Sequence, residues 1–191
     1  MQGGRASRTR RPRRPRHFAW LAALWLFAAP ADAAVAIRFH SKDFGATFPH
    51  AFIVLDGTLD ATGEPVSGNY GFTVRHLIGP SVLFGPVQGV VISEKTSYVE
   101  DSNHHFALQL TDAQYRAVMA LVDKWRALPQ PSYRLDSRNC VTFVAEVAAM
   151  LGLEADPTRL MRRPRAFLDR VRQRNTSVIA GQAPTPRVAA E

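Results

Sequence analysis

The order of the expected secondary-structure segments constrains the fold of this chain more than any other feature. All strand-like segments precede the helical ones, and a continuous apolar run at 51–55 has the length of a central, buried strand. Residues 69–74 are expected to form an antiparallel pair with it. Further strand-like segments lie at 34–40, 87–92 and 105–110. We therefore expect an α+β domain in which an antiparallel β-sheet packs against a helix.

Helical periodicity begins at Thr111. Thr111 and Gln114 form a capping-box pattern, and the apolar residues that follow recur at helical spacing as far as residue 128. A second helix is expected at 139–152, because Gly152 is the residue type that most favours a helix end.

A third, basic helical region is expected at 157–174, and Pro164 should split it because proline cannot continue the helical hydrogen bonds. Its arginines are expected to form a solvated face. Residues 176–191 are rich in Ala, Pro and Thr, a composition that predicts a disordered tail. The folded domain is thus expected to span residues 35–175.

The N-terminal segment has the pattern of a secretory signal. Residues 1–16 contain seven arginines and no acid, an apolar run follows at 18–29, and small residues precede a cleavage site after Ala33 or Ala34. The apolar run is shorter than the roughly 20 residues that span a bilayer. We therefore expect residues 1–34 to be a signal peptide, a periplasmic or secreted location, and no membrane span after processing. An uncleaved anchor is the alternative.

The high net charge of the chain comes largely from this segment. The whole sequence has 24 basic and 16 acidic residues, a balance of +8. Residues 1–33 hold seven of the basic residues and Asp32, so their removal leaves 24 − 7 = 17 basic and 16 − 1 = 15 acidic residues, or +2. A nucleic-acid partner needs a basic surface on the folded domain, so the charge does not indicate one.

Cys140 is the only cysteine in the chain, and it lies where a loop leads into the second helix. A thiol at a helix N-terminus feels the positive end of the helix dipole, which favours the reactive thiolate. His50, at the start of the central strand, is a histidine that can take the thiol proton. One cysteine with a histidine elsewhere is typical of nucleophilic thiol catalysis. The alternative is an inert thiol on an apolar helix face.

Three short stretches carry a resemblance to a known superfamily. They read Pro-His-Ala-Phe-Ile-Val at 49–54, Asn-Tyr-Gly-Phe at 69–72 and Asn-Cys-Val-Thr-Phe at 139–143. Their order resembles the circularly permuted branch of the papain-like superfamily, which includes NlpC-type cell-wall peptidases and lecithin–retinol acyltransferase. The resemblance implies a permuted papain-like fold in which Cys140 attacks a carbonyl carbon and His50 acts as base and then as acid. Backbone N–H groups at the helix start would hold the oxyanion.

Three residues are candidates for orienting the histidine. In the superfamily this role belongs to a polar residue on the strand after the histidine, and Asn69 is the natural candidate because its amide oxygen can accept from the imidazole. Tyr70 and Thr73 are the alternatives, and the alternation of the strand decides which of them faces His50. Asn69 can also be interpreted as a turn residue that enters a strand.

Other polar residues have simpler interpretations. His104 and His105 are adjacent on an expected strand, so their side chains should point to opposite faces and share no ion. The sequence has no His-Glu-x-x-His or Cys-x-x-Cys motif, and neither a metal nor another cofactor is expected. Tyr133 is expected to pack under the Cys140 helix; the alternative is that it covers the site. Residues 93–95 are expected to form a solvated turn; the alternative is that they line a substrate groove.

These features predict an exported cysteine hydrolase, an amidase or peptidase that acts through a thioester on a peptide or acyl substrate. In a bacterial host the expected substrate is a cell-wall peptide. A lipid acyltransferase or thioesterase is one alternative, with an acyl groove lined by Leu83, Phe84, Val90 and Val91. A catalytically silent binding domain on the same scaffold is the other.

Overall fold

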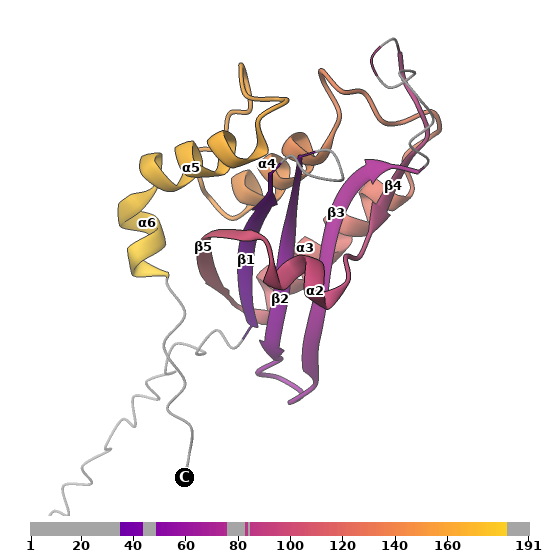
Figure 1. Cartoon of the computed structure of the whole chain (residues 1–191). Coiled ribbons are helices and arrows are strands. Elements are labelled where there is room, and N and C mark those ends of the chain that lie inside the picture. The colour runs from indigo at the N-terminus through magenta and orange to yellow at the C-terminus, as the bar shows by residue number, and fades with distance from the viewer. Residues whose placement is uncertain (1–34, 44–48, 76–82, 84, 183–191) are drawn as a thin grey trace, which may run out of the picture.

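A computed structural model of the protein describes residues 35–43, 49–75, 83 and 85–182 (Figure 1). The predicted signal segment, Phe84 and residues 183–191 of the predicted tail lie outside the described residues. The described residues form a five-stranded antiparallel sheet with helices packed on it, which confirms the predicted α+β class.

The sheet has the strand order β4-β3-β2-β1-β5, and each neighbouring pair runs antiparallel. The strands are β1 (Val35–Lys42), β2 (His50–Thr58), β3 (Pro65–Val74), β4 (Gly89–Ile92) and β5 (Asn103–Leu110). Strand β2 lies in the middle of the sheet, which confirms the position predicted for the apolar run at 51–55. Strands β1, β2 and β3 extend beyond their predicted ranges, because the pairing between neighbouring strands continues through polar residues at the strand ends.

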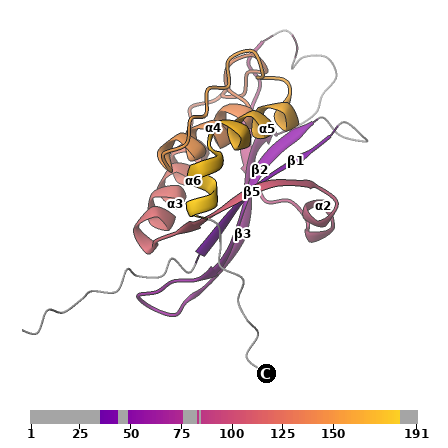
Figure 2. The same cartoon turned by 90° about the vertical axis from the view of Figure 1, so that its left-hand side faces the viewer.

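The helices lie on both sides of the sheet. They are α2 (Thr96–Glu100), α3 (Asp112–Arg126), α4 (Cys140–Met150), α5 (Pro164–Arg174) and α6 (Thr176–Gly181). Helices α3 to α6 lie on one side and α2 on the other (Figure 2). Helix α4 packs across β2 and β3, whereas α5 packs mainly across β1 and β5. The sequence did not predict α2, because so short a helix has no apolar period to recognise.

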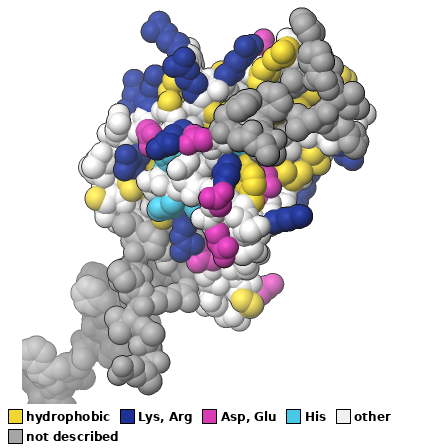
Figure 3. All heavy atoms as spheres, in the orientation of Figure 1, with side chains coloured by type: hydrophobic (Ala, Val, Ile, Leu, Met, Phe, Trp, Pro, Cys, Tyr) yellow, Lys and Arg dark blue, Asp and Glu magenta, His cyan; other side chains and the backbone are white. Residues whose placement is uncertain are grey.

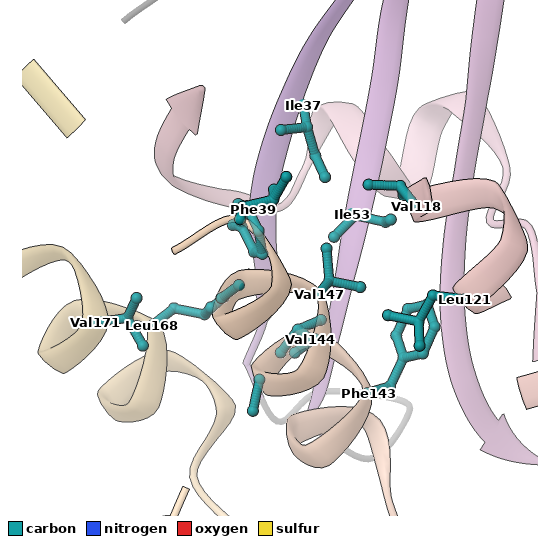
Figure 4. Packing of buried hydrophobic residues seen from close by; sticks show 14 of the residues in the cluster. Ile37, Phe39, Ile53, Val118, Leu121, Phe143, Val144, Val147, Leu168 and Val171 are labelled. Carbon is teal, nitrogen blue, oxygen red and sulfur yellow. The ribbon is translucent and has the colours of Figure 1, made fainter. Parts of the chain in front are cut away.

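One core of buried apolar side chains fills the space between the sheet and the helices (Figure 4). Alternate residues of β1 and β2, such as Ile37, Phe39 and Ile53, face the helices because successive strand residues point to opposite faces. They pack in one cluster with Val144 and Val147 of α4. Burial stabilises the fold by about 1.5–3 kcal/mol for each such side chain, so it holds α4 on the central strands.

The opposite face of the sheet carries a row of aromatic rings under α2. Phe52 is fully buried there, and its ring stacks with those of His40 and His50 at centroid distances of 5.5 and 5.9 Å. Tyr98 of α2 packs against the same phenylalanine, with 5.9 Å between ring centroids. The His50 ring therefore lies in the aromatic row and not in the helix-covered core.

Helix α5 begins at Pro164, as expected for a proline that splits the region 157–174 and starts a helix. Its apolar residues Phe167, Leu168 and Val171 are buried in the core. Lys and Arg side chains gather on the molecular surface around this helix (Figure 3), as predicted for a solvated basic face.

Helix α6 occupies residues where the sequence predicts a disordered tail. Asn175, just before it, is buried; its side chain accepts from the Glu154 N–H at 2.8 Å and donates to the Glu154 and Val171 carbonyl oxygens. After the helix, the Gln182 carbonyl oxygen accepts from the Gln109 N–H at 2.7 Å. These tertiary hydrogen bonds extend the folded domain to residue 182, so the predicted boundary at 175 is wrong.

The side chain of Asn139 joins three segments at the start of α4. Its Oδ1 atom accepts from the N–H groups of Val141 and Thr142, at 2.8 and 3.2 Å. Its Nδ2 atom donates to the carbonyl oxygens of Leu135 and Met161, both at 2.7 Å. Asn139 is 1% exposed, so water has no access to replace these partners.

Replacement of Asn139 by alanine is expected to lower the free energy of unfolding by about 2–4 kcal/mol, because a helix cap and the partners of two carbonyl groups are lost together. The matched control is Thr111→Ala, which removes the exposed cap of α3 and should cost about 1 kcal/mol. Urea unfolding followed by circular dichroism measures both variants. Equal losses would mean that Asn139 acts as a helix cap alone.

Candidate active site

Cys140 is the first residue of α4, and the packing of that helix on the sheet sets its position. Phe143, one turn further along, is fully buried, and Cys140 itself is 5% exposed. The backbone N–H groups of Ala51, Val141 and Cys140 itself interact with the sulfur. Because Ala51 directly follows His50, the sulfur lies beside the start of β2.

The thiol of Cys140 is protonated at neutral pH. Burial raises its pKa from 9.0 to about 11, because a charged sulfur would lose its hydration in the core. The backbone N–H groups around the sulfur lower the pKa by less than burial raises it. The sequence-based expectation of a thiolate favoured by the helix N-terminus is therefore wrong: desolvation outweighs the helix dipole.

His50 is the first residue of β2 and is 6% exposed. Its Nε2 atom is buried and has no hydrogen-bond partner among the described residues. The Oε1 atom of Glu94 lies 3.7 Å from Nε2. Burial lowers the pKa of His50 from 6.5 to about 4, so the imidazole is neutral at pH 7 and can act as a base.

Gly71 of β3 leaves the space that the His50 ring occupies. A Cβ atom at this position would lie 2.3 Å from His50 Nε2 and 3.0 Å from the Cβ atom of Phe52. Any side chain here would therefore displace the ring. Gly71 belongs to the Asn-Tyr-Gly-Phe stretch that the sequence analysis singled out, but no role was predicted for it.

The thiol and the imidazole approach the same end of β2 from its two faces. Cys140 belongs to the core cluster on the face that carries Ala51. His50 shares the other face with Phe52 and the open position at Gly71, as alternation along a strand requires. Among the described residues His50 Nε2 has no hydrogen-bond partner, so this atom does not bond to the sulfur. The structure thus brings the two segments together without pairing the two side chains.

The side-chain amide of Asn69 binds the backbone of Glu94 and not the His50 ring. The Glu94 N–H donates to Asn69 Oδ1 at 2.5 Å, and Asn69 Nδ2 donates to the Glu94 carbonyl oxygen at 3.0 Å. The sequence predicted a hydrogen bond from the imidazole N–H to the Asn69 amide oxygen. The structure does not have this hydrogen bond, because Asn69 binds the Glu94 backbone instead. Glu94 is the polar group that reaches His50.

The two alternatives to Asn69 lie on opposite faces of β3. Tyr70 is packed against the helix-covered core, with its ring centroid 5.3 Å from the Arg126 guanidinium. Thr73 follows the buried Phe72 and so points to the His50 side of the sheet. Glu94 was missed because it stands in a short polar stretch after a strand, where no periodic pattern distinguishes a functional acid from a solvated turn.

Tyr133 packs in the core near α4, as predicted. Its ring lies 5.7 Å from that of Phe72, and the residue is buried. Burial and, to a smaller extent, the proximity of Cys140 raise the pKa of its hydroxyl above the ordinary value. Tyr133 therefore presents a neutral hydroxyl group near the thiol.

A second set of side chains has the connectivity of a catalytic triad. Ser41 Oγ lies 2.8 Å from His105 Nε2, and His105 Nδ1 lies 2.9 Å from Asp169 Oδ1. No local sequence pattern indicates this set, because its members are distant in the chain. Ser41 is 0% exposed, so a substrate carbonyl cannot reach its hydroxyl. The set therefore acts as a polar network, buried at Ser41 and His105 and part-exposed at Asp169, that joins β1, β5 and α5.

His104 and His105 point to opposite faces, as predicted. The ring of His104 lies 5.2 Å from that of His40, whereas His105 binds Asp169 of α5. Within the described ranges, no group of three or more His, Cys, Asp or Glu side chains could hold a metal ion. In the same residues no helix has the length and apolarity needed to cross a membrane.

Comparisons with protein-family models, curated proteins and solved structures give no match to this chain. Its class therefore follows from the fold and the site alone. It is a mixed α+β domain with a single buried thiol at a helix start, beside the strand that carries a buried histidine.

The raised pKa of Cys140 predicts slow alkylation at neutral pH. As the only cysteine, it is the only thiol that iodoacetamide can modify. The rate constant near pH 7 is expected to be below that of free cysteine and to rise about tenfold per pH unit toward pH 10, because only the thiolate reacts. Mass spectrometry of the intact protein follows the reaction. An alkylation rate constant that no longer increases with pH above about pH 7 would contradict the raised pKa.

His50 also makes the stability of the fold depend on pH. Its pKa is about 4 in the folded protein against an ordinary 6.5, so between these values the unfolded chain binds a proton that the folded protein does not. The free energy of unfolding should therefore fall as the pH drops from 6.5 to 4. His50 should account for roughly 2–3 kcal/mol of the loss near pH 4.5.

Urea unfolding of the wild type and of His50→Gln, at about pH 7.5 and about pH 4.5, measures this contribution. The variant is expected to lose less stability on acidification, because it lacks the group that titrates. The same loss in both proteins would show that His50 has an ordinary pKa in the fold.

Proposed function

We propose that this protein is an exported cysteine hydrolase with a permuted papain-like arrangement. The proposal rests on one observation: the only cysteine is the first residue of α4, beside the Ala51 N–H at the start of the strand that carries His50. Acyl transfer through a thioester needs a thiol at such a site and a histidine within reach. The histidine strand also precedes the cysteine helix, as in the permuted branch.

The resting site holds a neutral thiol and a neutral imidazole. This follows from a pKa of about 11 for Cys140 and of about 4 for His50. His50 takes the thiol proton only as the sulfur attacks, in the way that a histidine activates a serine. The sulfur lies beside the backbone amide that follows His50, so the two residues are neighbours at this end of β2.

The reaction has two halves. In the first, the sulfur bonds to the substrate carbonyl carbon and its proton passes to His50. His50 then gives this proton to the leaving amine as the C–N bond breaks, and a thioester remains on Cys140. In the second half, His50 takes a proton from water as the water oxygen attacks the thioester. The C–S bond then breaks, the acid product leaves, and the sulfur regains the proton. These steps balance without a cofactor.

The charge that develops on the substrate oxygen needs hydrogen-bond donors. The N–H groups of Val141 and Thr142 donate to Asn139. The Cys140 N–H, which interacts with the sulfur in the resting site, is the remaining donor at this helix end. The Tyr133 hydroxyl supplies a second donor, since its raised pKa keeps it protonated at neutral pH. A single oxyanion donor typically contributes about 10²–10³ to the rate.

Cell-wall peptides are the proposed substrate, on the basis of the predicted export signal and the resemblance to NlpC-type peptidases. A lipid ester comes second, for a structural reason. Its acyl groove would use both Val90 and Val91, but successive residues of β4 point to opposite faces, and Val91 packs against the core. One groove cannot use both side chains.

The proposal is tested by digestion of a muropeptide mixture with the purified mature protein, with a lipid ester in a parallel assay. Cys140→Ala is expected to remove amide cleavage. His50→Ala should lower the rate at least about 100-fold, because general base catalysis contributes about 10²–10⁴. The matched control is His104→Ala, which alters an exposed histidine and should leave the rate near that of the wild type.

Mass spectrometry of the intact protein should detect an acyl adduct on Cys140 during turnover. Release of acyl groups from the lipid ester but not from muropeptides would favour the lipid alternative. Muropeptide binding without turnover, unchanged in Cys140→Ala, would indicate a catalytically silent domain.

A further inference from the structure

The Nε2 atom of His50 is the unexplained polar group of the candidate site. It is buried and has no hydrogen-bond partner among the described residues, an arrangement that costs free energy unless a nearby group compensates it. Glu94 Oε1 lies 3.7 Å away, within ion-pair range and just outside hydrogen-bond range. Catalytic hydrogen bonds are often this long before substrate binds.

The position of Glu94 is set through its backbone, which Asn69 holds. The Glu94 N–H donates to Asn69 Oδ1 at 2.5 Å, and Asn69 Nδ2 donates to the Glu94 carbonyl oxygen at 3.0 Å. Ser93 Oγ donates to the Asn69 carbonyl oxygen at 2.8 Å. Together these bonds fasten the segment after β4 to β3, and both polar atoms of the Asn69 side chain are engaged in them.

Packing confines the His50 ring on its other sides. The Phe52 ring stacks on it with an interplanar angle of 16° and 5.9 Å between centroids. Gly71 lies against Nε2 so closely that a Cβ atom there would be 2.3 Å away. The Glu94 side chain is itself only 17% exposed, so its carboxylate acts on the ring across a poorly solvated gap.

We propose that Glu94 is the positioning residue of the Cys140–His50 site and that Asn69 acts only by holding Glu94. The inference rests on the proposed hydrolase function. Burial raises the pKa of the Glu94 carboxyl group above its ordinary value. In its ionised form the carboxylate accepts hydrogen bonds but cannot donate them, so it selects the imidazole tautomer with its proton on Nε2. The Nδ1 atom then has the free electron pair that takes the proton from Cys140. The carboxylate also stabilises the imidazolium that this transfer forms.

A double-mutant cycle of Glu94→Gln and Asn69→Ser tests the inference. Glu94→Gln keeps the side-chain shape and removes the charge. It should lower kcat at least about tenfold and change KM less than about twofold, because the carboxylate acts on His50 and not on the substrate. Asn69→Ser should give a smaller loss of kcat. If Asn69 acts through Glu94, the double variant is no slower than Glu94→Gln. Losses that multiply would overturn the inference, because Asn69 would then act on His50 independently.

Glu100→Gln is the matched control, since Glu100 is an exposed acid of the neighbouring helix α2 and should leave kcat unchanged. Unfolding midpoints establish that each variant is folded. If Glu94→Gln does not fold, Glu94→Asp replaces it in the cycle. The shorter aspartate keeps the negative charge but places the carboxylate further from the His50 ring. It should again lower kcat with KM little changed, and wild-type kcat in this variant would overturn the inference.

Nitrogen NMR of the His50 ring, assigned by its loss in His50→Gln, tests the same inference without a substrate. The wild type is expected to have its proton on Nε2 near pH 7. In Glu94→Gln the amide NH₂ can donate to Nε2, so the Nδ1–H tautomer should become populated. If the His50 tautomer is the same in Glu94→Gln as in the wild type, the proposed role of Glu94 is wrong, even if the protein cleaves muropeptides. If the tautomer changes as expected but the protein cleaves no substrate, Glu94 does position His50 and the proposed hydrolase function is wrong.

Discussion

The packing of α4 against the central strands is the interaction on which the candidate site depends. The helix buries Phe143, Val144 and Val147 in the core, and this burial brings its first residue to the start of β2. Asn139 then fixes the direction of the helix start through hydrogen bonds to two other segments of the chain. Because packing along the helix and hydrogen bonds at its start act together, the Cys140 sulfur has little freedom relative to the strand that carries His50.

The same burial shifts the pKa values of the two groups in opposite directions. It raises the pKa of the Cys140 thiol and lowers that of the His50 imidazole, because both charged forms lose hydration. The site therefore stores no ion pair, and charge appears only during the proposed reaction. A carboxylate held near the imidazole is most effective in such a site, since a poorly solvated gap weakens an electrostatic interaction less than water does. Glu94 is placed in this way by its hydrogen bonds to Asn69.

The parts of the fold that were predicted from sequence depend on local patterns. The capping box of Thr111 and Gln114 is present at the start of α3, and the apolar run at 51–55 lies in the central strand. The boundary at residue 175 was wrong, because α6 is held by hydrogen bonds to residues far away in the chain. The triad-like network of Ser41, His105 and Asp169 was missed for the same reason.

By itself, the sequence determined the five strands and the helices α3, α4 and α5, that the domain is α+β, and that Cys140 begins a helix after the histidine strand. These features follow from periodicity and caps, which involve neighbours within a few residues. The tertiary structure alone decided that the thiol is protonated, that Gly71 makes room for the imidazole, and that Glu94 approaches it in place of Asn69. Burial and contacts between distant segments produce these properties, and no local pattern of residues encodes the distance between two segments that meet only on folding.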